Sequence, residues 1–189
     1  MKKIIFLLIV TITIFITYKT FSKKSIQILS LGDTKIENID IKNVKNYKNI
    51  TYDTIKITEL TSNIYNNNKQ SIKTNLAKSN ILFLSVGKDD IKNILNNSNN
   101  HINTYNEIDD IIKNYKELIN QVKKYARGKI IVLGVYEKDI DKKYLKYFNN
   151  ELKYILDDDI YYIDFNKYLN YSKTKKEIIN IYLNNGLIY

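Results

Sequence analysis

Glycines and short polar residues follow two apolar runs of the sequence, and the polar side chains among them are the ones best suited to chemistry. The runs are Ser25–Leu31 and Ile81–Val86, and the residues that follow are Gly32, Asp33, Thr34, Gly87, Asp89 and Asp90. A hydroxyl such as that of Thr34 can attack a carbonyl carbon once a base accepts its proton. Paired carboxylates can bind Mg²⁺ or Ca²⁺, but aspartates at turns and helix starts are equally common. We therefore predict no metal site and no cofactor.

These residues need a scaffold, and five runs of the sequence are predicted to be β-strands. Most are continuous apolar runs, which is typical of strands buried on both faces, whereas the second alternates polar and apolar residues. The five predicted strands are Ser25–Leu31, Asn49–Ile57, Ile81–Val86, Lys129–Leu133 and Ile160–Phe165. In a chain with five glycines, Gly32, Gly87 and Gly134 each follow one of these strands, which indicates tight turns there.

Helical periodicity separates the strands. It is clearest over Tyr105–Ala126, where apolar residues recur every three or four positions and Thr104 with Glu107 forms a predicted capping box. A second helix is predicted over Ile140–Leu156, and a third from Thr174 onward. Alternating strands and helices predict a three-layer, doubly wound α/β domain with a parallel sheet. The functional crevice of such a sheet lies outside the carboxyl ends of its strands.

Other segments have predominantly structural interpretations. Asn66–Asn68 and Asn96–Asn100 lack apolar periodicity and are predicted to be loops or helix ends. Asp157–Asp159 is predicted to be a turn rather than a cation loop. His101 is the only histidine, and we expect it in a solvent-exposed loop after the third strand. The many tyrosines could stack on sugars or bases, but core packing is the preferred interpretation.

Residues 1–24 are predicted to be an uncleaved signal anchor that forms one transmembrane helix. Lys2 and Lys3 precede the apolar Ile4–Ile16, and no small-x-small cleavage site follows. As a helix, Ile4–Tyr18 spans about 22 Å, which is short of the roughly 30 Å hydrocarbon core, so flanking lysines would have to snorkel. Residues 25–189 are then one domain, held at the cell membrane and facing the outside of the cell.

Composition restricts the partners only loosely. The net charge of +10 favours anionic partners such as lipid headgroups or envelope polyanions, although lysine-rich codon usage explains it as well. We predict a membrane partner and no nucleic acid. The absence of cysteine excludes a disulfide framework and a thiolate metal site.

Two blocks of the sequence resemble those of the SGNH (GDSL) hydrolases. Leu29–Thr34 (LSLGDT) resembles the Gly-Asp-Ser block, and Leu84–Asp90 (LSVGKDD), about fifty residues later, resembles the Gly-x-Asn-Asp block. The later KIIVLG and YYIDF segments resemble the fourth and fifth strands of that family. The resemblance covers residues 25–189 and implies a divergent, membrane-anchored bacterial member.

The resemblance implies a role for each residue of the two blocks. Thr34 stands in the place of the nucleophilic serine, next to Asp33, and its backbone N–H would be one oxyanion donor. Gly32, Gly87, Asp89 and Asp90 would line the oxyanion side of the crevice. Asp89 replaces the asparagine whose amide donates to the oxyanion, and a carboxylate cannot donate.

Further departures from the family pattern put catalysis in doubt. No glycine lies between Gly32 and Gly87 to supply the backbone donor of the second block. Ile179 and Tyr182 occupy the places of the family's catalytic aspartate and histidine. A serine-type hydrolase needs a base within hydrogen-bond reach, so the catalytic set is incomplete by the family's standard.

Three functions remain open from the sequence. The first is hydrolysis of esters in lipids or acylated envelope glycans. The second is a pseudoenzyme, an inactive SGNH-like domain that binds an envelope ligand without turnover. The third is a receiver-like signalling domain, in which Asp89 or Asp90 would accept a phosphoryl group with Mg²⁺ bound; an outward-facing domain argues against it.

Overall fold

The computed structural model describes residues 26–33, 44–66, 70–97, 101–164, 177, 179 and 180. The predicted anchor, residues 1–24, and the predicted nucleophile Thr34 lie outside these residues. Among the helices that are described, none combines the length and the apolar character needed to cross a bilayer.

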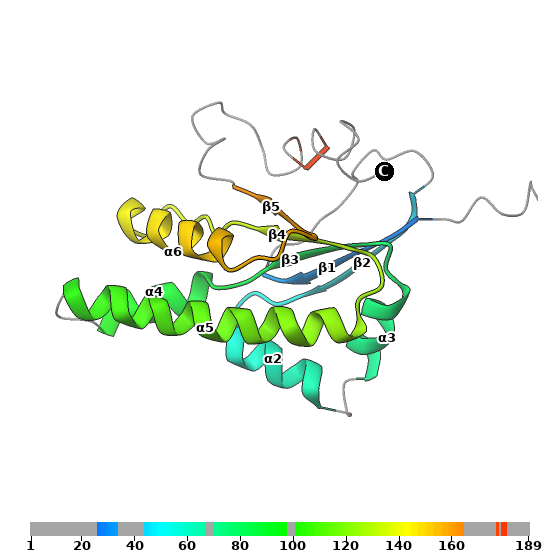
Figure 1. Cartoon of the computed structure of the whole chain (residues 1–189), viewed down its shortest axis with the longest axis horizontal. Helices are drawn as coiled ribbons and strands as arrows, with labels where there is room; N and C mark the ends of the chain where they lie inside the picture. Colours follow the sequence, from blue (N-terminus) through cyan, green and yellow to red (C-terminus); the bar gives the residue numbers. More distant parts are fainter. Residues whose placement is uncertain are drawn as a thin grey trace, which may run out of the picture.

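Five parallel strands form a single sheet in the order β2-β1-β3-β4-β5 (Figure 1). They are β1 (Ile26–Gly32), β2 (Val44–Thr51), β3 (Ile81–Ser85), β4 (Lys129–Leu133) and β5 (Ile160–Ile163). This order belongs to doubly wound sheets, in which the chain reverses direction across the sheet between β1 and β3. The predicted parallel α/β architecture is confirmed, and four of the five predicted strands agree with the structure within two residues at each end.

The helices α2 to α6 cover one face of the sheet (Figure 1). They are α2 (Ile57–Tyr65), α3 (Gln70–Lys78), α4 (Lys88–Asn97), α5 (His101–Tyr125) and α6 (Lys142–Tyr154). The long α5 is the centre of this layer and contacts the other four. Leu29, Leu82 and Ile130 lie in register on adjacent strands and belong to the core beneath these helices, which apolar burial stabilises.

The opposite face of the sheet is also buried. Ile28, Phe83 and Ile131 alternate with the residues that face the helices, and all three are shielded from solvent. Ile179, one of the helical residues described near the C-terminus, is buried as well. The prediction of strands buried on both faces is therefore confirmed for the central strands.

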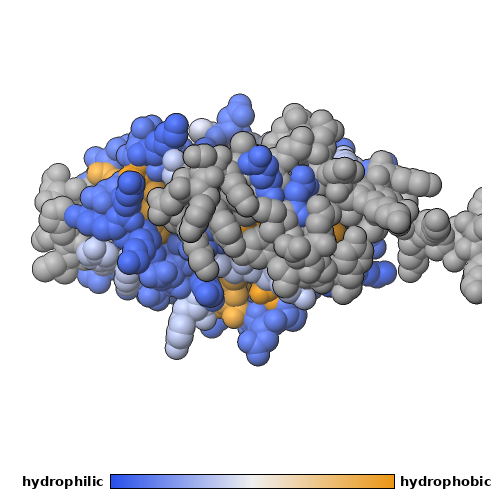
Figure 2. All heavy atoms as spheres, turned by 90° about the horizontal axis from the view of Figure 1, so that it is seen from above, coloured by the Kyte–Doolittle hydropathy of each residue, from blue (hydrophilic) through white to orange (hydrophobic). Residues whose placement is uncertain are grey.

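The described surface is mainly hydrophilic. On the face seen in Figure 2, apolar atoms form small patches between polar side chains. Large apolar side chains exposed within the described residues are those of Tyr65, Tyr154 and Tyr161. Tyr115 and Tyr144 are buried, as the core interpretation of the tyrosines predicts.

The predicted strand Asn49–Ile57 is wrong at both ends. β2 begins earlier, at Val44, and ends at Thr51, while Ile57 is the first residue of α2. β2 is an edge strand with exposed polar side chains, so its apolar signal is weak. Ile55 and Ile57 are buried and alternate with polar residues, a pattern that is also typical of a strand. Ile55 lies in a loop, however, and Ile57 begins α2.

The start of α5 also differs from prediction. The helix begins at His101, so Thr104 lies inside its first turn with a side chain that is 2% exposed. An N-cap residue lies outside the helical backbone, so the predicted capping box at Thr104 is wrong. His101 belongs to a helix and not to a loop; its side chain is outside the described residues.

Other local predictions agree with the structure. α6 matches the predicted helix within two residues, and Asp141 caps it by accepting a 2.9 Å hydrogen bond from the N–H of Lys143. Asp157–Asp159 forms the predicted turn, where Lys123 pairs with the carboxylates of Asp157 and Asp159. Asn66 and the pair Asn96 and Asn97 lie at helix ends, and the rest of both Asn-rich segments falls outside the described residues. Of the predicted helix from Thr174, residues 177, 179 and 180 are described and are helical.

Candidate active site at the carboxyl edge of the sheet

The turn after β1 is fixed to the end of β3. Gly32 is the last residue of β1 and has φ +118°, which L-amino acids with side chains rarely adopt. A Cβ atom at Gly32 would lie 1.8 Å from the backbone oxygen of Ser85. Only glycine therefore allows the two strand ends to approach this closely.

Asp33 follows directly and makes two hydrogen bonds with Ser85. Its backbone N–H donates to the backbone oxygen of Ser85 at 2.7 Å, and the Ser85 hydroxyl donates to Asp33 Oδ1 at 2.6 Å. The structure thus holds Asp33 at the carboxyl edge, as predicted. Sequence reasoning missed Ser85, although its place as the last residue of a buried strand was the available signal.

Asp89 and Asp90 lie in the first turn of α4 and bind the loop between β2 and α2. Asp89 Oδ2 accepts a 2.8 Å hydrogen bond from the N–H of Ile55, and Asp90 Oδ2 accepts a 3.0 Å bond from the N–H of Ile57. Carboxylates are favoured at helix N-termini by the helix dipole. Lys56, the N-cap residue of α2, makes no side-chain capping bond, so Asp90 caps α2 from another helix.

The two carboxylates therefore have a structural task. Burial raises the pKa of Asp90, and the hydrogen bond from Ile57 and the charge of Lys56 only partly oppose this effect. Asp33 bonds to Ser85, whereas Asp89 and Asp90 bond to a backbone loop. Within the described part of the chain, no group of three or more carboxylate, histidine or cysteine side chains is arranged to hold a metal ion.

Aromatic side chains form the floor beneath this edge. Tyr115 of α5 packs edge-on against Phe148 of α6, with ring centroids 6.3 Å apart. A Cβ atom at Gly87, which also has positive φ, would lie 2.9 Å from Phe148 Cζ. A Cβ atom at Gly134 would lie 2.7 Å from the hydroxyl oxygen of Tyr162. Both predicted glycine turns thus allow close packing of the floor.

The loop after β4 is held by a buried amide. Asn149 Oδ1 accepts a 2.8 Å hydrogen bond from the N–H of Val135, and Asn149 Nδ2 donates a 2.9 Å bond to the carbonyl of the same residue. Both partners are buried, so the loop geometry is fixed without solvent.

The only histidine of the sequence lies far from this edge along α5. His101 lies fourteen positions before Tyr115 in α5, which corresponds to about 21 Å along the helix axis. Ile179, in the family's aspartate position, is apolar and buried. Tyr182 lies outside the described residues.

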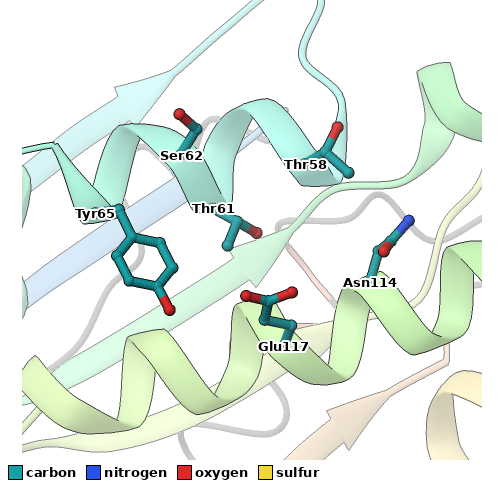
Figure 3. A pocket seen from close by; sticks show the side chains of 6 residues that line it. All are labelled: Thr58, Thr61, Ser62, Tyr65, Asn114 and Glu117. Carbon is teal, nitrogen blue, oxygen red and sulfur yellow. The ribbon is translucent and has the colours of Figure 1, made fainter.

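A separate polar groove of about 270 Å³ runs between α2 and α5. Figure 3 shows its lining side chains, which are Thr58, Thr61, Ser62, Tyr65, Asn114 and Glu117. The Tyr65 hydroxyl accepts a 2.6 Å hydrogen bond from Gln121 Nε2, which fixes that ring. None of the predicted site residues lines this groove.

Comparisons with known proteins identify the fold. No family model matches the sequence, and no curated protein matches it. A lipase from a goat rumen metagenome is similar in structure, with a TM-score of 0.59 and 15% identity over 80% of this chain and 85% of the lipase. An extracellular lipase from Streptomyces rimosus has a TM-score of 0.45 and 10% identity, over 74% of this chain and 80% of the lipase. A phospholipase A1 from Streptomyces albidoflavus has a TM-score of 0.49 and 11% identity, over 82% of this chain and 85% of the phospholipase. The similarity to the goat rumen lipase confirms the predicted SGNH (GDSL) resemblance at the level of the fold.

Proposed function

We propose that this chain is a membrane-anchored, SGNH-type acyl hydrolase that cleaves esters in lipids or acylated envelope glycans. The observation that carries the proposal is the fixed turn at Gly32 and Asp33. Ser85 holds Asp33 at the carboxyl edge of the central strand β1. Thr34, the next residue in the sequence, aligns with the nucleophile in the sequence block of the fold family.

In the proposed reaction, the Thr34 hydroxyl oxygen attacks the ester carbonyl carbon. Its proton passes to a base, for which Asp33 is the nearest carboxylate in sequence, and the backbone N–H of Thr34 donates to the oxyanion. The alcohol then leaves with a proton, and water hydrolyses the acyl-threonine. The threonine methyl group crowds the approach of the substrate, which favours a slow enzyme.

The second candidate function is binding without turnover, and the position of Asp89 favours it. The carboxylate accepts a bond from the backbone of Ile55 and has no hydrogen to donate to an oxyanion. In the fold family an asparagine amide stands there, and removing one such donor typically costs about 100- to 1000-fold in turnover. The crevice would then hold an acylated envelope ligand.

Membrane attachment rests on the sequence of residues 1–24, and we propose that the domain faces outward. Protease added to intact cells should digest the domain. Digestion only after the membrane has been opened would contradict this orientation.

Hydrolysis of p-nitrophenyl butyrate by the purified full-length chain tests the two functions. Turnover by the wild type that is lost in Thr34→Ala and retained or raised in Thr34→Ser would establish the nucleophile. Absence of turnover in all three proteins would reject the hydrolase and leave the binding function.

A further inference from the structure

Two phenol hydroxyls beneath the carboxyl edge are buried without a hydrogen-bond partner. Within the part of the chain that the structure describes, the hydroxyl oxygens of Tyr115 and Tyr162 have no partner, and the whole Tyr115 side chain is 0% exposed. A buried polar group left unsatisfied is destabilising, and native proteins rarely keep one without a reason such as a bound water or a ligand.

The two hydroxyls belong to one region of the site. The Tyr162 side chain points to the helix-covered face next to Val132, and its hydroxyl oxygen approaches Gly134, just past the end of β4. Tyr115 reaches the same region from α5 and packs on Phe148, whose ring approaches Gly87 just past the end of β3. Just past their ends, the neighbouring strands β3 and β4 thus approach Phe148 and Tyr162, respectively.

Both phenols remain protonated at neutral pH. Burial raises the pKa of each, and for Tyr115 the negative charge of Asp33 and then the neighbouring Tyr162 raise it further. Each therefore presents an O–H donor and not a phenolate. Asp33, next to the proposed nucleophile, is close enough for its charge to affect Tyr115.

We propose that Tyr115 and Tyr162 are a pair of O–H donors for the oxygen of an acyl group or tetrahedral oxyanion bound in the crevice. This inference rests on the proposed function and deepens it, because the pair supplies the donors that Asp89 cannot. Donors excluded from water and without a competing partner are the arrangement that stabilises an oxyanion most strongly.

Thermal unfolding of the full-length chain gives the first test. Tyr115→Phe and Tyr162→Phe remove only the hydroxyl, so each should raise the Tm by about 2 to 4 °C if the hydroxyl is unsatisfied in the free protein. Tyr147→Phe is the matched control, because the Tyr147 hydroxyl donates a 2.8 Å bond to Asp109 and its loss should lower the Tm. A lower Tm in both Tyr115→Phe and Tyr162→Phe would overturn the inference.

Ligand binding gives the second test and needs no turnover. Butylphosphonate is a tetrahedral anion with an alkyl chain, and inorganic phosphate is the matched anion that controls for the basic net charge. Titration calorimetry should show butylphosphonate binding that weakens at least about tenfold in the Tyr115→Phe, Tyr162→Phe double variant and is unchanged in Tyr147→Phe. Equal binding by wild type and double variant would overturn the inference.

The outcomes separate this inference from the proposed hydrolase. Tyrosine-dependent butylphosphonate binding without ester turnover would retain the donor pair and reject the hydrolase. Ester turnover that is unchanged in the double variant would retain the hydrolase and reject the donor pair.

Discussion

Ser85 and Asp33 are joined side chain to side chain and backbone to backbone across two adjacent strands. The Ser85 hydroxyl donates to the Asp33 carboxylate at 2.6 Å, and the Asp33 N–H donates to the Ser85 carbonyl at 2.7 Å. Ser85 is only 4% exposed and Asp33 is half-buried, so the side-chain bond is partly shielded from bulk water. Hydrogen bonds to charged groups are stronger than neutral ones in such surroundings. The turn that precedes Thr34 is therefore held rigidly.

Replacing this serine should destabilise the fold. Ser85→Ala removes the hydrogen bond that the buried Ser85 hydroxyl donates to the Asp33 carboxylate, and we expect a loss of about 1.5 to 3 kcal/mol in the free energy of unfolding. Urea denaturation followed by circular dichroism measures it. Ser62→Ala, at an exposed position of α2, is the control and should change stability by less than about 0.5 kcal/mol. Equal effects of the two substitutions would contradict a structural role for the Ser85 hydroxyl.

The sequence predicted the scaffold wherever a local pattern determines it. Ile130–Leu133 of β4 is apolar and buried, and the three-to-four residue repeat over α5 follows from one helix packing on a sheet. β2 was misplaced because its neighbour Ile57 owes its helix start to Asp90, thirty-three residues away. No local pattern contains such a contact, so propensity alone could not separate the strand from the helix.

Restoring the family's amide should increase turnover. In Asp89→Asn, the side-chain oxygen can still accept from the N–H of Ile55, while the new NH₂ group supplies a donor toward the crevice. We expect ester hydrolysis to rise by about 100-fold, measured as kcat/KM for p-nitrophenyl butyrate. Asp110→Asn, an exposed carboxylate paired with Lys113, is the control. A variant no faster than the wild type would show that the oxyanion is stabilised elsewhere.

Asp90 makes stability depend on pH. Burial raises its folded-state pKa above the ordinary value of 3.8, so the folded state binds the proton more tightly than the unfolded chain does. The stabilisation from protonation is complete below pH 3.8 and is lost as the pH rises through the folded-state pKa. Asp90→Asn keeps the oxygen that accepts from Ile57 and removes the buried charge.

We therefore expect Asp90→Asn to be more stable than the wild type at pH 7, and this advantage should shrink toward zero below pH 3.8. The midpoints of urea denaturation of both proteins between pH 3 and pH 8 measure the difference in stability. The other carboxylates are the same in both proteins, so their contributions cancel in this difference. An advantage that is the same at every pH would mean that charge burial is not its cause.

The residues of the site were predictable in position but not in their contacts. Parallel topology brings Asp33, Asp89 and Asp90 to one edge because strands end there together. Their partners, which are a strand-end serine and two loop N–H groups, depend on packing between distant segments. The periodicity of α5 marks Tyr115 as a core residue, but it cannot show that its hydroxyl lacks a partner.

Gly134 and Tyr162 should be energetically coupled. A methyl group added at Gly134 would lie 2.7 Å from the Tyr162 hydroxyl oxygen, closer than unbonded atoms allow, so Gly134→Ala must push the ring aside. Tyr162→Phe removes the oxygen and opens that space. We expect Gly134→Ala to cost more in the wild type than in the Tyr162→Phe background, with a coupling of about 1 kcal/mol. A double-mutant cycle of urea denaturation measures it, and additive effects would mean that the hydroxyl does not lie against Gly134 in solution.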